Sequence, residues 1–251
     1  ISKEEVEGVG IGVPGPVNSK GEVSRAVNLF WGFKAVTKEL TELTGLPSMA
    51  GNDANVAALG EAWKGAAAGA KNVIMVTLGT GVGGGIILDS RIISGSHGAG
   101  GEIGHAAVQH DETEKCNCGN RGCLEQYASA TGIAKLARKA LSGEHEETVL
   151  HREPSAKDVF DAVKAGDALA TRIADEFGRY LGAALASLAV VVDPAVFVIG
   201  GGVSKAGPVL IPFVEKEFQK RAFFANKDTK IVLAELGNDA GICGAARLIL
   251  N

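Results

Sequence analysis

The sequence predicts an α/β fold. Short apolar runs that are typical of buried strands alternate along the chain with longer stretches of helical periodicity. Glycine accounts for 35 of the 251 residues, roughly double its usual share of about 7%. The glycines cluster between the apolar runs, where an α/β protein has its loops. The chain is long enough to bury a sizeable core in one large domain or two lobes.

The elements of the first half begin and end at residues that predict their boundaries. Pro14 and Pro16 form a turn after the first apolar run, and Gly45 with Pro47 ends the first amphipathic helix. The predicted elements are a buried strand at 9–13, a helix at about 34–44, an extended piece at 47–50, an Ala-rich helix from 51–55 to about 67, a buried strand at 73–78, a tight glycine turn at 79–85 and a strand at 86–88.

The second half continues the alternation. Ser155 and Asp158 have the spacing of a capping box, and Pro194 breaks the longest predicted helix. The predicted elements are a helix from about 124, a polar surface loop at 143–153, a helix opening at 155–158, a long helix at 167–192, a strand at 196–199, a helix after 208, a strand at 230–236 and a helix entered at 238–246.

Composition and charge exclude several functional classes. The formal net charge is -4 and the sequence pI is about 5.8, so we expect no nucleic-acid partner and no binding to acidic lipid. Apolar runs of the roughly 18 residues that a membrane span needs are absent, and so is a signal peptide. Three of the four cysteines lie within eight residues, which suits a metal site better than a disulfide framework. We therefore expect a protein of the reducing cytoplasm.

One His and three Cys have the spacing of a closed tetrahedral zinc site. Cys116 and Cys118 form a C-x-C pair, Cys123 follows five residues later, and His105 completes four ligands. Four protein ligands leave no open position, so the predicted Zn²⁺ is structural. A reduced, metal-free loop is the alternative. His110 is a competing nitrogen ligand, but its polar surroundings at 110–115 favour a solvated loop residue.

The Asn52-Asp53 dipeptide precedes a predicted helix. A hydroxyl that accepts a phosphoryl group needs a carboxylate within hydrogen-bond reach, and Asp53 at a strand end is suitably placed. The alternative is an ordinary helix N-cap, which is the commoner role of these residue types. Two other carboxylates, Glu102 and Glu125, flank the predicted zinc ligands and suit hydrogen bonding to sugar hydroxyls. Glu61 is expected on a solvated helix face.

Two glycine runs are candidates for binding phosphate or nucleotide. Backbone N–H groups in the run at 79–85 could hold anionic phosphates, and Thr80 adds a hydroxyl donor. This run is not a Walker A sequence, since no Gly-Lys-Ser/Thr follows. A tight turn between two buried strands is the alternative. The glycines at 200–202 could accept a nucleotide or make a close strand–helix turn.

In their order along the chain, these motifs resemble the ROK family of sugar kinases and regulators. The matching segments are 12–16, 28–31, 51–61, 78–85, 102–125 and 199–203, so the resemblance covers essentially the whole chain. It implies a two-lobed actin-like ATPase (ribonuclease H-like) fold with an interlobe cleft and a zinc-binding loop. The smaller lobe would comprise 1–52 plus about 240–251, and the larger lobe 53–239.

The resemblance also implies an ATP-dependent hexose kinase, and glucokinase is the activity we expect. Asp53 would be the catalytic base, while Asn52, Glu102, His105 and Glu125 would hold the sugar. His105 would use one ring nitrogen for zinc and the other for a sugar hydroxyl. ATP and Mg²⁺ are the implied cofactors besides zinc. The implied ATP-binding residues are Gly79, Thr80, Gly81, Gly83, Gly84, Gly200, Gly201 and Gly202.

One part of the family pattern, a phosphate loop of the form Asp-x-Gly-Gly-Thr, has its place upstream of Ile1. Because the chain also lacks an initiator Met, we expect it to be the remainder of a longer protein. Other sugars suit the resemblance: N-acetylmannosamine, N-acetylglucosamine, fructose and allose. A sugar-sensing transcriptional regulator is the main alternative function, and a zinc-stabilised binding or scaffold protein without turnover is another. A homodimer is what the family suggests.

Overall fold

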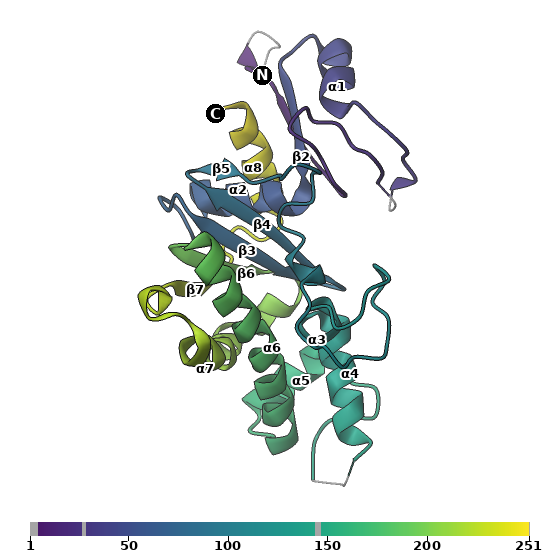
Figure 1. Cartoon of the computed structure of the whole chain (residues 1–251), viewed down its shortest axis with the longest axis vertical. Helices are drawn as coiled ribbons and strands as arrows, with labels where there is room; N and C mark the ends of the chain where they lie inside the picture. The colour runs from purple at the N-terminus through teal and green to yellow at the C-terminus, as the bar shows by residue number, and fades with distance from the viewer. Residues whose placement is uncertain (1–4, 27–28, 144–146, 251) are drawn as a thin grey trace. The chain divides into compact units, whose positions relative to one another are not determined.

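The computed structural model describes residues 5–26, 29–143 and 147–250 (Figure 1). Two parts of the sequence motifs, Asn28 and the segment 144–146 of the predicted polar loop, lie outside the described residues. The chain folds into two compact units. The first contains 1–75, 84–102 and 234–251, and the second contains 76–83 and 103–233. The lobes expected from the sequence, 1–52 plus about 240–251 and 53–239, stay a prediction.

A small parallel sheet forms part of the first unit. Strand β1 (Val9–Val13) pairs in parallel with β2 (Ser48–Asn52) and brings Val13 opposite Asn52. The prediction of a strand at 9–13 is confirmed, but only Val13 is buried. Helix α1 (Val36–Thr44) packs on β2 and ends at Gly45, whose left-handed backbone (φ 68°) a glycine adopts readily.

Two helices of the first unit cross at unusually close range. Helix α2 (Asp53–Lys64) packs along α8 (Asp239–Ile249), and α8 also packs on β1 and β2. A Cβ added at Gly60 would lie 2.0 Å from the Ala240 carbonyl oxygen. A Cβ added at Gly244 would lie 1.7 Å from the Val56 carbonyl oxygen. These glycines therefore let the two helix backbones touch.

The second sheet has five strands in the order β5-β4-β3-β6-β7. Strand β3 is confirmed as predicted, and β6 and β7 pair in parallel. The prediction for β4 is wrong at its start, because the strand begins at Val82 and includes the glycines at 83–85. Only glycine fits at position 85, because α2 lies against it. A Cβ at Gly85 would be 2.6 Å from the Cβ of Ala58. The bounds are β3 (Val73–Leu78), β4 (Val82–Leu88), β5 (Arg91–Ile92), β6 (Val196–Gly200) and β7 (Lys230–Leu233).

Helices fill most of the second unit. The capping box at Ser155 and Asp158 is confirmed, and Asp167 caps the long helix at its predicted start. The helix predicted from about 124 is instead two helices separated at Ser129, whose backbone is extended. The helices are α3 (Glu125–Ala128), α4 (Ala130–Leu141), α5 (Ala156–Lys164), α6 (Ala168–Val192) and α7 (Ile211–Arg221). Edge-to-face pairs of phenylalanines, Phe160 with Phe177 and Phe197 with Phe218, lie in the core.

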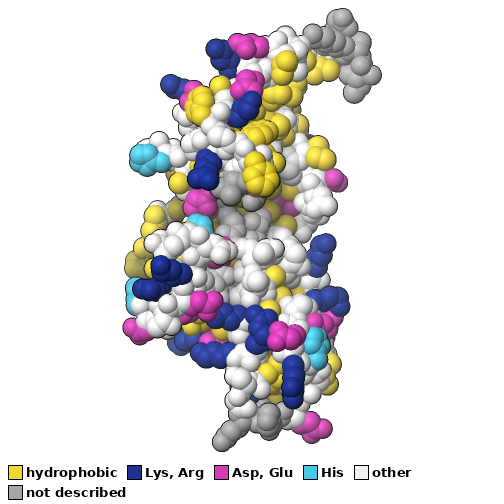
Figure 2. Space-filling model, turned by 90° about the vertical axis from the view of Figure 1, so that its right-hand side faces the viewer, with side chains coloured by type: hydrophobic (Ala, Val, Ile, Leu, Met, Phe, Trp, Pro, Cys, Tyr) yellow, Lys and Arg dark blue, Asp and Glu magenta, His cyan; other side chains and the backbone are white. Residues whose placement is uncertain are grey.

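Among the described helices, none combines the length and the apolar character that crossing a bilayer requires. The face drawn in Figure 2 shows basic and acidic side chains next to one another. Among the described residues, exposed ion pairs include Lys216 with Asp175 (2.7 Å) and Lys157 with Asp161 (2.5 Å). A surface of mixed sign agrees with the small net charge of the sequence.

Candidate functional site

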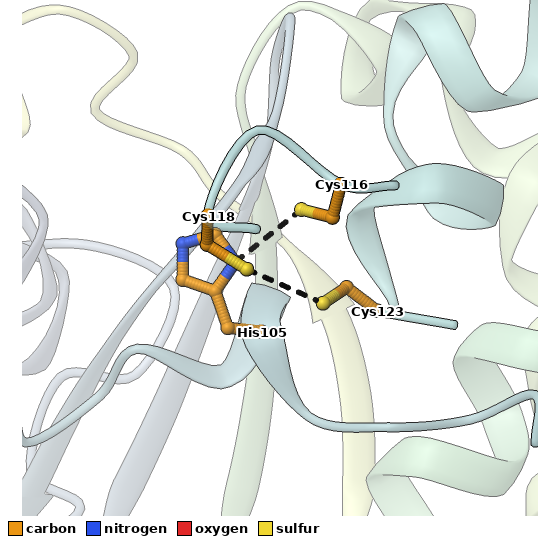
Figure 3. Close-up of side chains that lie close together, drawn as sticks. All are labelled: His105, Cys116, Cys118 and Cys123. Carbon is orange, nitrogen blue, oxygen red and sulfur yellow. Dashed lines mark hydrogen bonds between the residues drawn. The ribbon is translucent and has the colours of Figure 1, made fainter. Parts of the chain in front are cut away.

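The predicted metal ligands converge on one point. The ligand atoms of His105, Cys116, Cys118 and Cys123 all lie within 4.8 Å of one another. The Cys116 Sγ is 3.8 Å from the His105 Nδ1, and the Cys118 Sγ is 3.7 Å from the Cys123 Sγ (Figure 3). With metal–sulfur bonds of about 2.3 Å, the sulfurs of a tetrahedral zinc site are about 3.8 Å apart. The donor set and its spacing therefore fit zinc.

Local backbone geometry brings the three sulfurs together. The Cys116 N–H donates to the Asn120 carbonyl (2.8 Å), closing a turn around the C-x-C pair. Gly119 (φ 93°) and Gly122 (φ 71°) occupy backbone conformations that other residues rarely adopt. At Gly122 a side chain would also collide with the Gln109 carbonyl oxygen, 1.7 Å from the position of a Cβ. Glycine at these two positions is what lets the loop close.

The three thiols differ in how readily they ionise. Burial raises the pKa of Cys116 and of Cys123. A hydrogen bond from the Asn120 backbone lowers the pKa of the exposed Cys118. Metal ligation uses the thiolate form of each sulfur.

Glu125, the first residue of α3, joins this cluster to a glycine turn. Its Oε1 accepts a hydrogen bond from the Cys116 Sγ (2.8 Å) and lies 3.7 Å from the His105 Nδ1. Its Oε2 lies 2.6 Å from the point where a Cβ on Gly81 would stand. The structure thus brings a predicted sugar ligand, the predicted metal ligands and part of a predicted phosphate-binding run together.

A second group of side chains holds the loop before Cys116, and the sequence interpretation missed it. The Tyr127 hydroxyl donates to a Glu112 carboxylate oxygen (2.5 Å), and Lys135 pairs with Glu114 (2.6 Å). Tyr127 also stacks on Tyr180, with ring centroids 4.1 Å apart. The hydrogen bond from the Tyr127 hydroxyl is the chief reason that the pKa of Glu112 is lowered. Burial is the chief reason that the pKa of Tyr127 is raised. The sequence showed only a polar run, because both aromatic partners lie in helices beyond it.

The structure separates the roles of Asn52 and Asp53. Asn52 is the N-cap of α2: its Oδ1 accepts from the Asn55 N–H (3.1 Å), and its Nδ2 donates to the Gly15 carbonyl (3.1 Å). Asp53 is exposed, and its carboxylate accepts a hydrogen bond from the Ala54 N–H (2.9 Å). The capping role therefore belongs to Asn52, which leaves the Asp53 carboxylate accessible.

The segment before the cluster carries Glu102, whose side chain is exposed. Glu102 belongs to the same unit as Asn52 and Asp53, whereas His105 and Glu125 belong to the other. Near Gly101, which precedes Glu102, lies the Asn55 Oδ1. Among the described residues it is the buried side-chain polar atom that has no hydrogen-bond partner. That oxygen lies 3.4 Å from the place of a Cβ on Gly101.

The structure brings the two glycine runs together. The turn at 79–81 follows β3, and the Gly79 N–H donates to the Gly81 carbonyl (3.0 Å). Gly201 (φ 85°) lies against the last residue of β3: its Cβ would be 2.6 Å from the Leu78 carbonyl oxygen. Gly200 ends β6, and Gly202 follows. Gly83 and Gly84, also predicted to bind ATP, lie inside β4 and not in the turn.

Comparison with known proteins identifies the family. The model of the ROK family matches residues 2–251. The chain belongs to the ROK family. This confirms the resemblance seen in the sequence motifs.

Relatives of this ROK chain include enzymes and regulators. A protein named glucokinase from Halalkalibacterium halodurans is 45% identical, over 99% of this chain and 77% of the relative. A ROK family glucokinase from Streptomyces griseus, solved with glucose and AMPPNP, is 36% identical with a TM-score of 0.81, over 97% of this chain and 81% of that one. A ROK family transcriptional regulator, a homolog of the E. coli MLC protein, is 32% identical with a TM-score of 0.85, over 98% of this chain and 62% of that one.

Proposed function

We propose that this ROK protein is an ATP-dependent glucokinase that converts glucose to glucose 6-phosphate. The observation that carries the proposal is the contact of Glu125 with both the Cys/His cluster and the 79–81 turn. A carboxylate suited to sugar hydroxyls is thereby held beside a turn suited to phosphates. The 45% identity to a named glucokinase and the glucose- and AMPPNP-bound neighbour support the same reaction.

Asp53 is the general base of the proposed reaction. Its carboxylate takes the proton of the glucose 6-hydroxyl while that oxygen attacks the γ-phosphorus of ATP, and ADP leaves with the bridging oxygen. The accessible carboxylate of Asp53, freed from capping by Asn52, supports this role. Mg²⁺, when bound with ATP, neutralises charge on the phosphates.

Sugar recognition is assigned to Asn52, Glu102, His105 and Glu125. Each offers a polar atom to a sugar hydroxyl, and carboxylates accept strongly from such donors. Phosphate binding is assigned to the 79–81 turn with Thr80 and to the glycines at 200–202, which share the end of β3. Gly83 and Gly84, in β4 directly after the turn, are assigned to ATP binding as well.

Zinc is the proposed occupant of the His105, Cys116, Cys118 and Cys123 cluster. Four ligands fill its coordination, so the ion stabilises the loop and supplies no reactive water. Ligation through the His105 Nδ1, the atom that faces Cys116, leaves the other ring nitrogen for a sugar hydroxyl. We further propose a homodimer, the cytoplasm as its location, no nucleic-acid partner, and lobes of 1–52 plus about 240–251 and of 53–239.

The first experiment measures Mg-ATP-dependent phosphorylation of a hexose panel by the full-length protein and by Asp53→Asn. We expect turnover of glucose that falls by a factor of about 10² to 10⁴ in the variant, the range of general-base catalysis. Glucose binding should persist in Asp53→Asn. Preference for N-acetylmannosamine, N-acetylglucosamine, fructose or allose would correct the substrate and keep the reaction.

A regulator is the second candidate, because the transcriptional-regulator neighbour shares the fold at 32% identity. A sugar sensor binds its sugar without transferring phosphate. Sugar binding with no turnover in the unmodified protein would therefore overturn the glucokinase proposal and favour the sensor.

A further inference from the structure

The 79–81 turn is fastened to the junction between α3 and α4. The Ala130 N–H donates to the Gly79 carbonyl (2.8 Å), and the Thr131 hydroxyl donates to the Thr80 carbonyl. Glu125, at the start of α3, has its Oε2 2.6 Å from the point where a Cβ on Gly81 would stand. Three successive residues of the turn are thus each contacted by one short segment, 125–131, which starts immediately after the cysteine cluster.

The break between the two helices makes these contacts available. Helix α3 ends at Ala128, and α4 starts at Ala130 with Ser129 as its N-cap. The first N–H groups of a helix have no partner within it, so the Ala130 N–H is free to reach the turn. The Ser129 Oγ accepts from the Gly132 N–H (3.0 Å) and lies 3.3 Å from the Thr131 Oγ1. Its own hydroxyl can donate to that oxygen while the Thr131 hydroxyl donates to the Thr80 carbonyl.

These bonds orient the peptide groups of the turn. In a trans peptide the carbonyl and the following N–H point in opposite directions, and the described residues contain no cis peptide bond. Because the Gly79 and Thr80 carbonyls both point toward the start of α4, the N–H groups of Thr80 and Gly81 point away from it. Two adjacent N–H groups directed to one side are a suitable arrangement for an anionic phosphate oxygen.

We propose that Thr131 is a positioning residue for ATP, acting through its hydrogen bond to the Thr80 carbonyl. This inference rests on the proposed kinase function and adds a residue outside the glycine runs. Without the Thr131 hydroxyl the Thr80–Gly81 peptide is free to rotate, and the two N–H groups no longer present a fixed pair to the phosphates. Sugar recognition is assigned to side chains outside this peptide, so the affinity for glucose should depend on it far less than the affinity for ATP.

The test compares Thr131→Val with Thr131→Ser in the full-length protein. Valine keeps the branched shape and removes the hydroxyl, whereas serine keeps the hydroxyl. We expect Thr131→Val to raise KM for ATP about 3- to 10-fold, the effect of one hydrogen bond. KM for glucose and the thermal midpoint should stay near those of the unmodified protein, and Thr131→Ser should restore KM for ATP.

Thr171→Val is the matched control, since the Thr171 hydroxyl also donates to a backbone carbonyl, that of Asp167 (2.8 Å), but away from the turn. An unchanged KM for ATP in Thr131→Val would overturn the inference. Equal rises in KM for ATP and for glucose, or no recovery in Thr131→Ser, would overturn it as well. Should no form phosphorylate glucose, the Kd for AMPPNP of the same variants decides the inference, while the kinase proposal fails separately.

Discussion

At the scale of single residues, Glu61 shows how far a side chain can depart from its sequence pattern. The sequence places it on a solvated helix face, and that prediction is wrong: Glu61 is 0% exposed. Its carboxylate accepts hydrogen bonds from the N–H groups of Ala66 (2.8 Å), Leu236 (2.8 Å) and Glu235 (3.3 Å). These bonds replace the water that a buried carboxylate otherwise requires.

Replacement of Glu61 by Gln should destabilise the protein by about 1–3 kcal/mol. The amide NH₂ of glutamine would face backbone N–H groups, which are donors too, and the bonds that remain would lose the carboxylate as acceptor. Glu176→Gln is the control: its side chain is 38% exposed, and surface changes of this kind stay within about 0.5 kcal/mol. Urea unfolding of both variants measures the difference. Equal midpoints for the two would show that the buried bonds contribute nothing.

Tyr127 and Glu112 give a prediction about pH. The pKa of Glu112 is lowered chiefly by the Tyr127 hydroxyl, so their bond stabilises the fold above the unfolded-state pKa of about 4.3. That contribution is lost as pH falls through the lowered pKa. Tyr127→Phe should cost about 1 kcal/mol at pH 7, with a shrinking difference from the unmodified protein below about pH 4.

Unfolding by urea at a series of pH values measures this effect. Tyr180→Phe is the control, because it keeps the stacked ring and leaves the Tyr127–Glu112 bond intact. A Tyr127→Phe penalty that persists unchanged at low pH would mean that Glu112 is not the partner that matters.

The residue scale also shows what a sequence can and cannot settle. The four predicted metal ligands lie together, as their spacing indicates. They fall within 19 positions of one another, and local turns close the loop that carries them. The structure was needed to assign the capping role at Asn52-Asp53 to Asn52, since both residue types cap helices well, and Asp53 as base stays a prediction. The burial of Glu61 could not be predicted from the sequence, because two of its hydrogen-bond partners follow it by 174 and 175 positions.

At the scale of elements, glycines decide how closely helices and strands approach. The run at 79–85 reads as one turn in the sequence, yet only its first part is a turn and the rest is strand β4. Glycine serves both purposes, one through backbone freedom and the other through the missing side chain. A pattern of glycines alone does not distinguish them, because the helix that needs the space, α2, precedes the run in the chain.

The crossing of α2 and α8 yields a sharp test. Gly244→Ala should destabilise the protein by about 1–3 kcal/mol, because the new Cβ meets the Val56 carbonyl at 1.7 Å and the helices must move apart. Gly241→Ala lies in the same helix, where a Cβ has nothing within 4 Å. That control should stabilise the protein by up to about 1 kcal/mol through helix propensity. Thermal unfolding that ranks the two in the opposite order would contradict the described packing.

At the scale of the whole molecule, metal and sugar binding are expected to be linked. A ligand that binds only the folded protein stabilises it by about 2.7 kcal/mol at 100 times its Kd. Removal of the proposed zinc by a chelator, or Cys118→Ser, should therefore abolish the rise in thermal midpoint caused by glucose, since the ion is what would fix the His105 ring among the three sulfurs. Cys243→Ser, outside the cluster, is the control and should keep one zinc per chain and the full response to glucose.

The sequence order of strands and helices was largely predictable, and family membership confirms the resemblance that the motifs carry. The division into units was less accessible. The first unit gathers three separate stretches of chain, and the second is formed by what lies between them. Periodicity and turn residues depend on neighbours in the sequence. They therefore predict single helices and strands better than they predict which distant elements pack into one unit.

The burial of Glu61 against the segment before α8 has a consequence for biosynthesis. Ribosomes add about 5–20 residues per second, so the N–H partners of Glu61 that follow it by 174 and 175 positions are made on the order of 10 s after it. Until then α2 carries the Glu61 carboxylate without those partners and an apolar face without α8. The second unit, nearly continuous from 103 to 233, is complete before then. The nascent chain therefore contains the whole second unit before α2 meets α8, its partner near the end of this sequence.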